Sequence, residues 1–112
     1  MTEIEVAWLA GILEGEGCFD YNNLGQSIKT GTWYPRIRIE LTDLDVVEKV
    51  AKLLGGEAQV QPHKPREKFN AKPTWSFQCG SRDRMKELLP LLLPHMGARR
   101  GKVISQMISR LG

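Results

Sequence analysis

The chain has 112 residues, and its 16 Lys or Arg against 13 Asp or Glu give a net charge of +3. This length predicts a single domain over residues 1–112 and excludes a multidomain enzyme. With 41% hydrophobic and 26% charged residues, the composition excludes intrinsic disorder, and every apolar run is shorter than the ~20 residues of a membrane helix. The N-terminus is acidic where a targeting peptide would be basic, and there are only two cysteines. We therefore expect a cytoplasmic protein with free thiols, or an organellar or phage-encoded one, rather than a secreted one.

The charge is divided unevenly along the chain. Residues 1–20 hold five carboxylates and no Lys or Arg, whereas the remainder holds 16 Lys or Arg against eight Asp or Glu. A basic remainder of the chain after an acidic first segment favours a polyanionic partner such as nucleic acid. Proteins that bind no nucleic acid also reach a surplus of positive charge of this size.

The first predicted element is a helix without a polar side. Thr2 and Glu5 have the spacing of a capping box, so the helix begins there, and it extends to about Glu14. The residues from Val6 to Leu13 are all apolar or small, and such a helix must be covered on two sides, of which a domain this small covers only one. A second copy of the chain would cover the other side, where small residues allow a close approach: Ala10, Gly11 and Gly15.

Period-two alternation after the helix predicts a β-hairpin. The first strand follows the helix directly, a tip rich in Gly, Ser and Thr covers 25–32, and the second strand runs from Trp33 to Leu41. A helix capped by Thr42 or Asp43 follows and stops at the glycines 55–56.

The same ββα unit then repeats. It consists of a strand at 58–63, a basic tip at 64–72, a strand at 74–79 and a short helix from its Ser81 cap to Pro90. A last helix over 98–111 has one clean apolar stripe. The predicted order is α-ββα-ββα, an α+β fold whose four-stranded antiparallel sheet has helices on one face only.

The uncovered sheet face and its tips carry residue types that hydrogen-bond DNA. Arg pairs with guanine, Gln and Asn pair with adenine, and Lys binds phosphates. An ordinary solvated face is the alternative, and the basic tip at 64–72 favours the nucleic-acid interpretation. The candidates for DNA binding are Asn22, Gln26, Lys29, Arg36, Arg38, Gln59, Gln61, Lys64, Arg66, Lys68, Lys72, Thr74, Ser76 and Gln78.

Two carboxylates stand at the end of the first helix and oppose the negative end of its dipole. Each costs a few tenths to ~1 kcal/mol there, so Glu14 and Glu16 are expected to have a cation nearby, either a basic side chain or a metal. The flanking glycines leave carbonyls free as hard ligands for Mg²⁺. If two such helices met, the two copies of Glu16 would repel each other unless divalent cations lay between them.

The stretch from Leu9 to Gly17, LAGILEGEG, resembles the LAGLIDADG motif of the homing endonucleases of introns and inteins, and Cys18-Phe19 extends the likeness. Glu replaces Asp at the sixth and eighth motif positions, which are Glu14 and Glu16. The predicted α-ββα-ββα order also resembles that family's domain along essentially the whole chain.

The resemblance implies a site-specific endonuclease that cuts double-stranded DNA with Mg²⁺ or another divalent cation. Glu16 and the main-chain carbonyl of Gly15 would bind the metal, and the sheet would occupy the major groove. Because only one motif is present, the chain would act as a homodimer on near-palindromic DNA. The motif helices would form the interface, with contributions from Trp8, Ala10, Gly11, Leu13, Glu14 and Gly15.

The other catalytic positions of the family match less closely. Glu40, at the end of the second strand, is the candidate for the polar residue that positions the attacking water. Some relatives use a lysine near the start of the last helix, where the stretch 97–102 offers several basic candidates, and we choose Arg99. Trp33, beside the first tip, is either a core residue or a nucleic-acid contact.

Two further functions stay open. A non-catalytic relative could bind intron RNA as a maturase or bind DNA without cutting it, although the acid retained at Glu16 favours the nuclease. A dimeric scaffold without a nucleic-acid partner leaves the basic tip and the polar sheet face unexplained.

Overall fold

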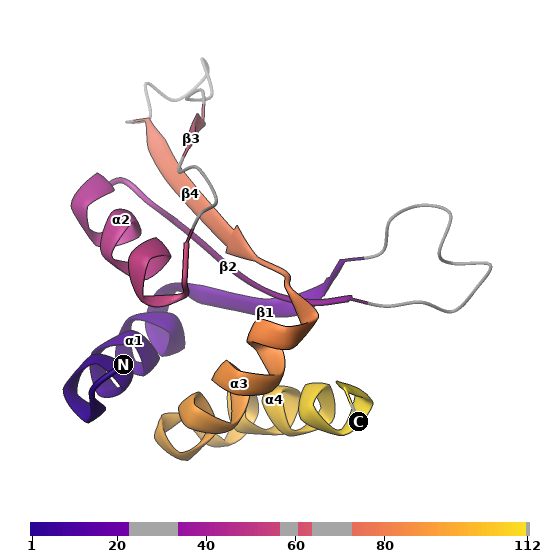
Figure 1. Ribbon diagram of the computed structural model, residues 1–112. Helices are drawn as coiled ribbons and strands as arrows, with labels where there is room; N and C mark the ends of the chain where they lie inside the picture. Colours follow the sequence, from indigo (N-terminus) through magenta and orange to yellow (C-terminus); the bar gives the residue numbers. More distant parts are fainter. Residues whose placement is uncertain (23–33, 57–60, 64–72, 112) are drawn as a thin grey trace.

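The computed structural model describes residues 1–22, 34–56, 61–63 and 73–111. Its elements in chain order are α1 (Glu3–Glu16), β1 (Gly17–Asn22), β2 (Tyr34–Leu41), α2 (Leu44–Leu53), β3 (Gln61–His63), β4 (Thr74–Cys79), α3 (Arg82–Leu92), the 3₁₀ turn η3 (Leu93–His95) and α4 (Ala98–Leu111). This order confirms the predicted α-ββα-ββα arrangement (Figure 1). Both predicted hairpin tips and the first half of the predicted 58–63 strand lie outside the described residues.

The capping box at the start of α1 is confirmed. The main-chain N–H of Glu5 donates to Thr2 Oγ1 at 3.1 Å, and the N–H of Thr2 donates to Glu5 Oε1 at 2.8 Å. The pKa of Glu5 lies below its ordinary value because it accepts this bond. The helix ends at Glu16, two residues beyond the predicted end, and strand β1 follows with no intervening loop.

The four strands form one antiparallel sheet in the order β1-β2-β4-β3. Its covered face contributes Phe19, Ile37, Ile39, Phe77 and Cys79 to the core, and all five are less than 10% exposed. Because the side-chain period of a strand is two, the residues between them face away from the helices. The helices therefore lie on one side of the sheet, and the other side is open (Figure 1).

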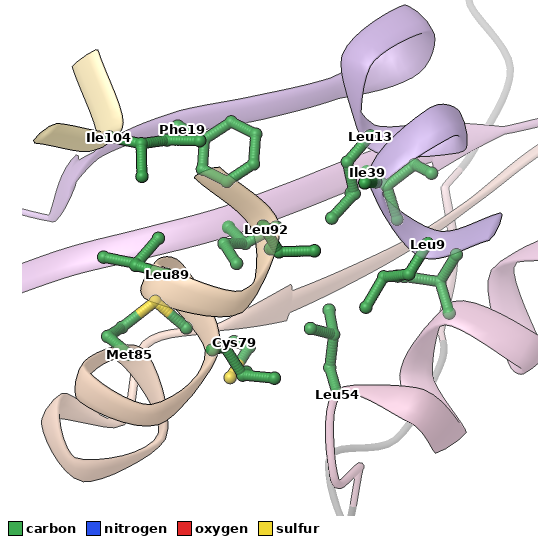
Figure 2. Close-up of a cluster of buried hydrophobic side chains, with 14 of the residues drawn as sticks. Leu9, Leu13, Phe19, Ile39, Leu54, Cys79, Met85, Leu89, Leu92 and Ile104 are labelled. Atoms are coloured by element: carbon green, nitrogen blue, oxygen red, sulfur yellow. The ribbon is translucent and has the colours of Figure 1, made fainter. Parts of the chain in front are cut away.

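The helices cover the sheet with a continuous apolar core. Leu9 and Leu13 of α1, Leu89 of α3 and Ile104 of α4 are all 0% exposed and lie in one cluster (Figure 2). Helix α4 has the predicted bounds, and its stripe is confirmed because Ile104, Met107 and Leu111 are buried. Helix α2 ends at Leu53, just before the predicted glycines 55–56, and so confirms that prediction. Gly55 has a φ of 85°, a conformation that favours glycine.

Helix α3 corrects one boundary. Its Ser81 cap is confirmed, but the helix continues through Pro90 to Leu92 instead of ending at the proline. Proline removes one hydrogen bond from the last turn. The ring of Pro90 is exposed, while Leu88, Leu89 and Leu92 are buried, so packing of the leucines holds the last turn in helical form.

Within the described ranges, every helix falls short of the length and apolar character that crossing a bilayer requires.

Candidate functional site

The end of α1 presents two carboxylates in different surroundings. Glu16 is exposed and makes no ion pair within the described residues, and the adjoining Gly15 is also exposed. Glu14 is only partly exposed, and its Oε2 is buried without a hydrogen-bond partner among the described residues. The two acids therefore lie in different surroundings, since Glu14 has Arg100 beside it whereas Glu16 is exposed without an ion pair among the described residues.

Arg100 of α4 holds this helix end in place. Its Nε donates a 2.8 Å hydrogen bond to the main-chain oxygen of Glu14 and lies 3.7 Å from Glu14 Oε2. Its side chain is 19% exposed, so this bond is largely shielded from water. The cation expected beside the acidic pair is thus, for Glu14, a basic side chain.

Arg99, the predicted basic residue of the site, is exposed at the start of α4, and no described contact joins it to α1. The sequence contains a signal that favours its neighbour. Arg100 precedes Ile104 by four residues and Met107 by seven, so it extends the buried stripe of α4 toward the N-terminus. Helical period therefore identifies Arg100 as the residue that faces the rest of the molecule.

Glu40 also belongs to this region. The register pairs Gly17 with Ile39, so Glu40 lies one position beyond the pair, beside the point where α1 ends. Its side chain is exposed on the open side of the sheet. The strand pairing thus brings the two predicted catalytic acids, Glu16 and Glu40, to the same end of the sheet.

The described residues supply only part of a set of metal ligands. Glu16 and the Gly15 carbonyl are oxygen donors of the kind that Mg²⁺ prefers. However, the described residues contain no group of three or more His, Cys, Asp or Glu side chains that could hold a metal ion. The described residues fit a hard cation only if further oxygen ligands complete the set, such as those of a second copy or a phosphate.

The outer face of α1 is open. A methyl group built at Gly11 or at Gly15 meets no atom within 4 Å, and Ile4 on the same helix is 82% exposed. Trp8 is partly exposed, and the ammonium of Lys49 lies 4.0 Å from its ring centre. This face is available to a second chain.

Two residues predicted for the dimer interface do not fit it. Ala10 and Leu13 are 0% exposed, and both belong to the hydrophobic core of their own chain. The reason is helical geometry, because positions 9, 10 and 13 share the face that covers the sheet, whereas 4, 11 and 15 point away from it. Sequence alone could not distinguish the two faces, since both are apolar.

The open sheet face carries a cluster of charges centred on Asp20. Arg36 Nε lies 2.6 Å from Asp20 Oδ1, and Arg38 Nη2 lies 2.6 Å from Asp20 Oδ2. Partial burial acts to raise the pKa of Asp20, but the hydrogen bond from Arg36 and the charge of Arg38 outweigh it, so the pKa lies below its ordinary value. We did not expect Asp20 at this site from the sequence.

The remaining predicted DNA contacts are distributed as follows. Ser76 and Gln78 lie on the open face beside β2, because the register pairs Gln78 with Arg38 and Ser76 with Glu40. Asn22, Gln61 and Thr74 are placed at strand ends. The other candidates, together with Trp33, lie outside the described residues: Gln26, Lys29, Gln59, Lys64, Arg66, Lys68 and Lys72.

Solved structures similar to this chain include homing endonucleases. The homing endonuclease I-TnaI has a TM-score of 0.70 and 20% identity, covering 95% of this chain and 70% of its own. I-CvuI, in complex with its target in the presence of 2 mM Ca, has a TM-score of 0.66 and 20% identity, covering 97% of this chain and 68% of its own. The LAGLIDADG homing endonuclease I-LtrWI, bound to target DNA, has a TM-score of 0.68 and 15% identity, covering 96% of this chain and 38% of its own.

A scan against protein-family models and a search of curated protein sequences find no match. The likeness therefore lies in the three-dimensional arrangement, and it extends along nearly the whole chain. The chain has the fold of the LAGLIDADG homing endonucleases, in agreement with the resemblance of residues 9–17.

Proposed function

We propose that this protein is a DNA endonuclease of the homing type, which acts as a homodimer and depends on a divalent cation. One observation carries the proposal: Glu16 is an exposed carboxylate with no described ion pair at the end of a helix whose outer face is open. A second chain packed on that face would bring two copies of Glu16 together. The homing endonucleases with the same fold, among them one bound to target DNA, support this function.

Each residue of the site has a proposed role. Glu16 and the Gly15 carbonyl would hold the cation. Such a cation, when bound, would supply the charge that lowers the pKa of the attacking water and neutralises the phosphate. Glu40 orients the water, and Arg99 is placed to approach a phosphate from the start of α4. I-CvuI structures in complex with DNA, obtained in 2 mM Ca and, with the DNA not cleaved, in 2 mM Mg, are consistent with a divalent cation at the proposed site.

The test separates cutting from binding. Target DNA is first selected from a pool of random duplexes by the unmodified protein, and plasmids that carry it are then incubated with Mg²⁺. Glu16→Gln keeps the size of the side chain but removes its charge, so cleavage should fall by orders of magnitude while binding in Ca²⁺ persists. Glu48→Gln is the matched control, because Glu48 is an exposed acid on α2.

Equal cleavage by Glu16→Gln and the unmodified protein would exclude Glu16 as a metal ligand. Specific binding without cleavage by either protein would instead favour the non-catalytic function, on DNA or on intron RNA.

A further inference from the structure

Asp20 binds two arginines on the open sheet face, which the sequence predicts to contact DNA. Asp20 is paired with Arg36 across the β1–β2 ladder, and Arg38 lies two residues along β2 on the same face. Asp20 Oδ1 accepts from Arg36 Nε at 2.6 Å, and Oδ2 accepts from Arg36 Nη2 at 3.3 Å and from Arg38 Nη2 at 2.6 Å. The guanidinium groups therefore meet at a single oxygen atom.

The bonds to Asp20 leave some N–H donors of Arg36 and Arg38 without a partner among the described residues. Arg36 presents its inner edge, Nε and Nη2, to the carboxylate. Arg38 uses Nη2, which also lies 3.5 Å from the sulfur of Cys18. No bond among the described residues involves Nη1 of either arginine. Guanine accepts two hydrogen bonds from one guanidinium at O6 and N7, and the outer edge of Arg36 has the matching pair of donors.

The arginines are held in position but still reach solvent. Their side chains are 22% exposed for Arg36 and 44% exposed for Arg38. A free arginine loses considerable rotamer entropy when it binds a base, and an arginine that is already held loses less.

The acid also lowers the attraction for phosphate. Two arginines and one aspartate carry a charge of +1 instead of +2, so Asp20 weakens any contact that depends on charge alone. The pKa of Asp20 lies below its ordinary value because the arginines outweigh the effect of burial, so the carboxylate is ionised at neutral pH. A surface built only to attract the DNA backbone would be stronger without it, which favours a role in reading bases.

We infer that Asp20 is a positioning residue that orients Arg36 and Arg38 to bind guanines at two neighbouring base pairs in each half of the DNA target. The inference rests on the proposed function, because it requires the open sheet face to lie in a DNA groove. Asp20 lowers the affinity of the protein for DNA of any sequence and increases its preference for guanine.

Binding selection from random duplexes, followed by sequencing, tests the inference in Ca²⁺, where cleavage is suppressed. We expect guanine at two neighbouring positions per half-site for the unmodified protein. Arg36→Ala and Arg38→Ala should each remove the preference at one of them, by about fivefold or more. Asp20→Asn should weaken the preference at both positions, while its affinity for non-specific DNA rises because each chain loses a negative charge.

Two control variants make the result specific. Asp45→Asn causes the same change of charge at an exposed position of α2, and it should leave the guanine preference unchanged. Asp20→Glu keeps the carboxylate and should restore part of the preference, and this rescue separates positioning from loss of the fold.

The outcomes distinguish this inference from the proposed function. Unchanged guanine preference in Asp20→Asn, or specific binding by the unmodified protein without guanine at positions sensitive to Arg36 and Arg38, would overturn the inference alone. Failure of the unmodified protein to bind duplex DNA would overturn the proposed function as well.

Discussion

Arg100 joins the acidic end of α1 to the start of α4 through one main-chain carbonyl and one carboxylate. Replacing it with Met keeps the length of the side chain but leaves the buried Glu14 Oε2 without its cation. Loss of a charged hydrogen bond at a largely buried position should lower the free energy of unfolding by about 1–3 kcal/mol. Urea unfolding measures the change, with Arg99→Met as the exposed control.

The same variant has a functional readout. If Arg100 keeps the α1 end in the orientation that Glu16 needs, single-turnover cleavage by Arg100→Met should slow while its affinity for target DNA stays close to that of the unmodified protein. Equal stability and equal cleavage rates for Arg100→Met and the unmodified protein would show that the bond to Glu14 has no such role.

The pairing of Asp20 with its two arginines should make stability depend on pH. Its pKa is lowered from an ordinary value of 3.8, so the folded state binds its proton more weakly than the unfolded state does. The stabilisation is then complete above the unfolded pKa and is lost as the pH falls through the folded pKa. The pair is partly exposed, so we expect no more than about 1 kcal/mol at neutral pH.

Urea unfolding across acidic and neutral pH checks this expectation. The difference in free energy of unfolding between the unmodified protein and Asp20→Asn should be constant near about pH 6 and should decline below about pH 4. A difference that does not change over this range would mean that Asp20 gains nothing from the arginines in the folded state.

Single residues show what the sequence can and cannot predict. Glu16 was recognisable because the motif is contiguous in the chain. The ion pairs of Asp20 with Arg36 and Arg38 could not be predicted, because they depend on the register between β1 and β2, which only the paired strands define. The contact of Arg100 with the end of α1 was not predicted, although the period of α4 contained the information.

At the level of elements, the proposed dimer depends on the outer face of α1. Gly11 has open space around it, so Gly11→Leu can fold without a clash inside its own chain. The substitution should even raise the stability of the monomer, since Gly costs about 1 kcal/mol in a helix interior. In a dimer, the leucine would separate the two helix backbones.

Light scattering on the unmodified protein and two variants tests this dimer contact. The unmodified protein should have the mass of a dimer and Gly11→Leu that of a monomer, while Ser105→Leu, an exposed site on α4, should stay dimeric. A monomeric unmodified protein would contradict the proposed mechanism.

Element boundaries follow the sequence wherever local chemistry determines them. The capping box, the glycine of positive φ after α2 and the stripe of α4 were all predicted correctly. Pro90 misled the prediction because a proline usually ends a helix, whereas here the buried side of α3 continues to Leu92. Tertiary packing outweighed the local signal.

At the level of the whole molecule, all 16 Lys and Arg residues lie beyond the first 20 residues. Lys68 belongs to the basic stretch at 64–72, outside the described residues, and we expect it to bind phosphate. Lys68→Ala should reduce the slope of log affinity against log salt by roughly two for a dimer, since each lost phosphate contact contributes about 0.9.

Titration of the binding affinity with salt provides the measurement. Lys86→Ala on the helical side removes the same charge from an exposed position of α3 and should change the slope much less. Equal slopes for the two variants would mean that the basic stretch does not contact DNA in a particular orientation.

The topology of the whole molecule was predictable because two ββα units repeat, and four strands with helices on one face satisfy that pattern. The way in which two chains would pack together was only partly predictable from the sequence. An apolar helix signals that two faces need cover, but the positions of Ala10 and Leu13 inside the core emerge only once the sheet is in place.

The carboxylate shared by Arg36 and Arg38 has a consequence for how recognition changes over time. Residues in one hydrogen-bonded network have non-additive effects, so substitution of one arginine would change the orientation of the other. A mutation that adapts the protein to a new base would then disturb recognition of the neighbouring base. The preferred target would therefore change in coupled steps of two base pairs rather than drift one base at a time.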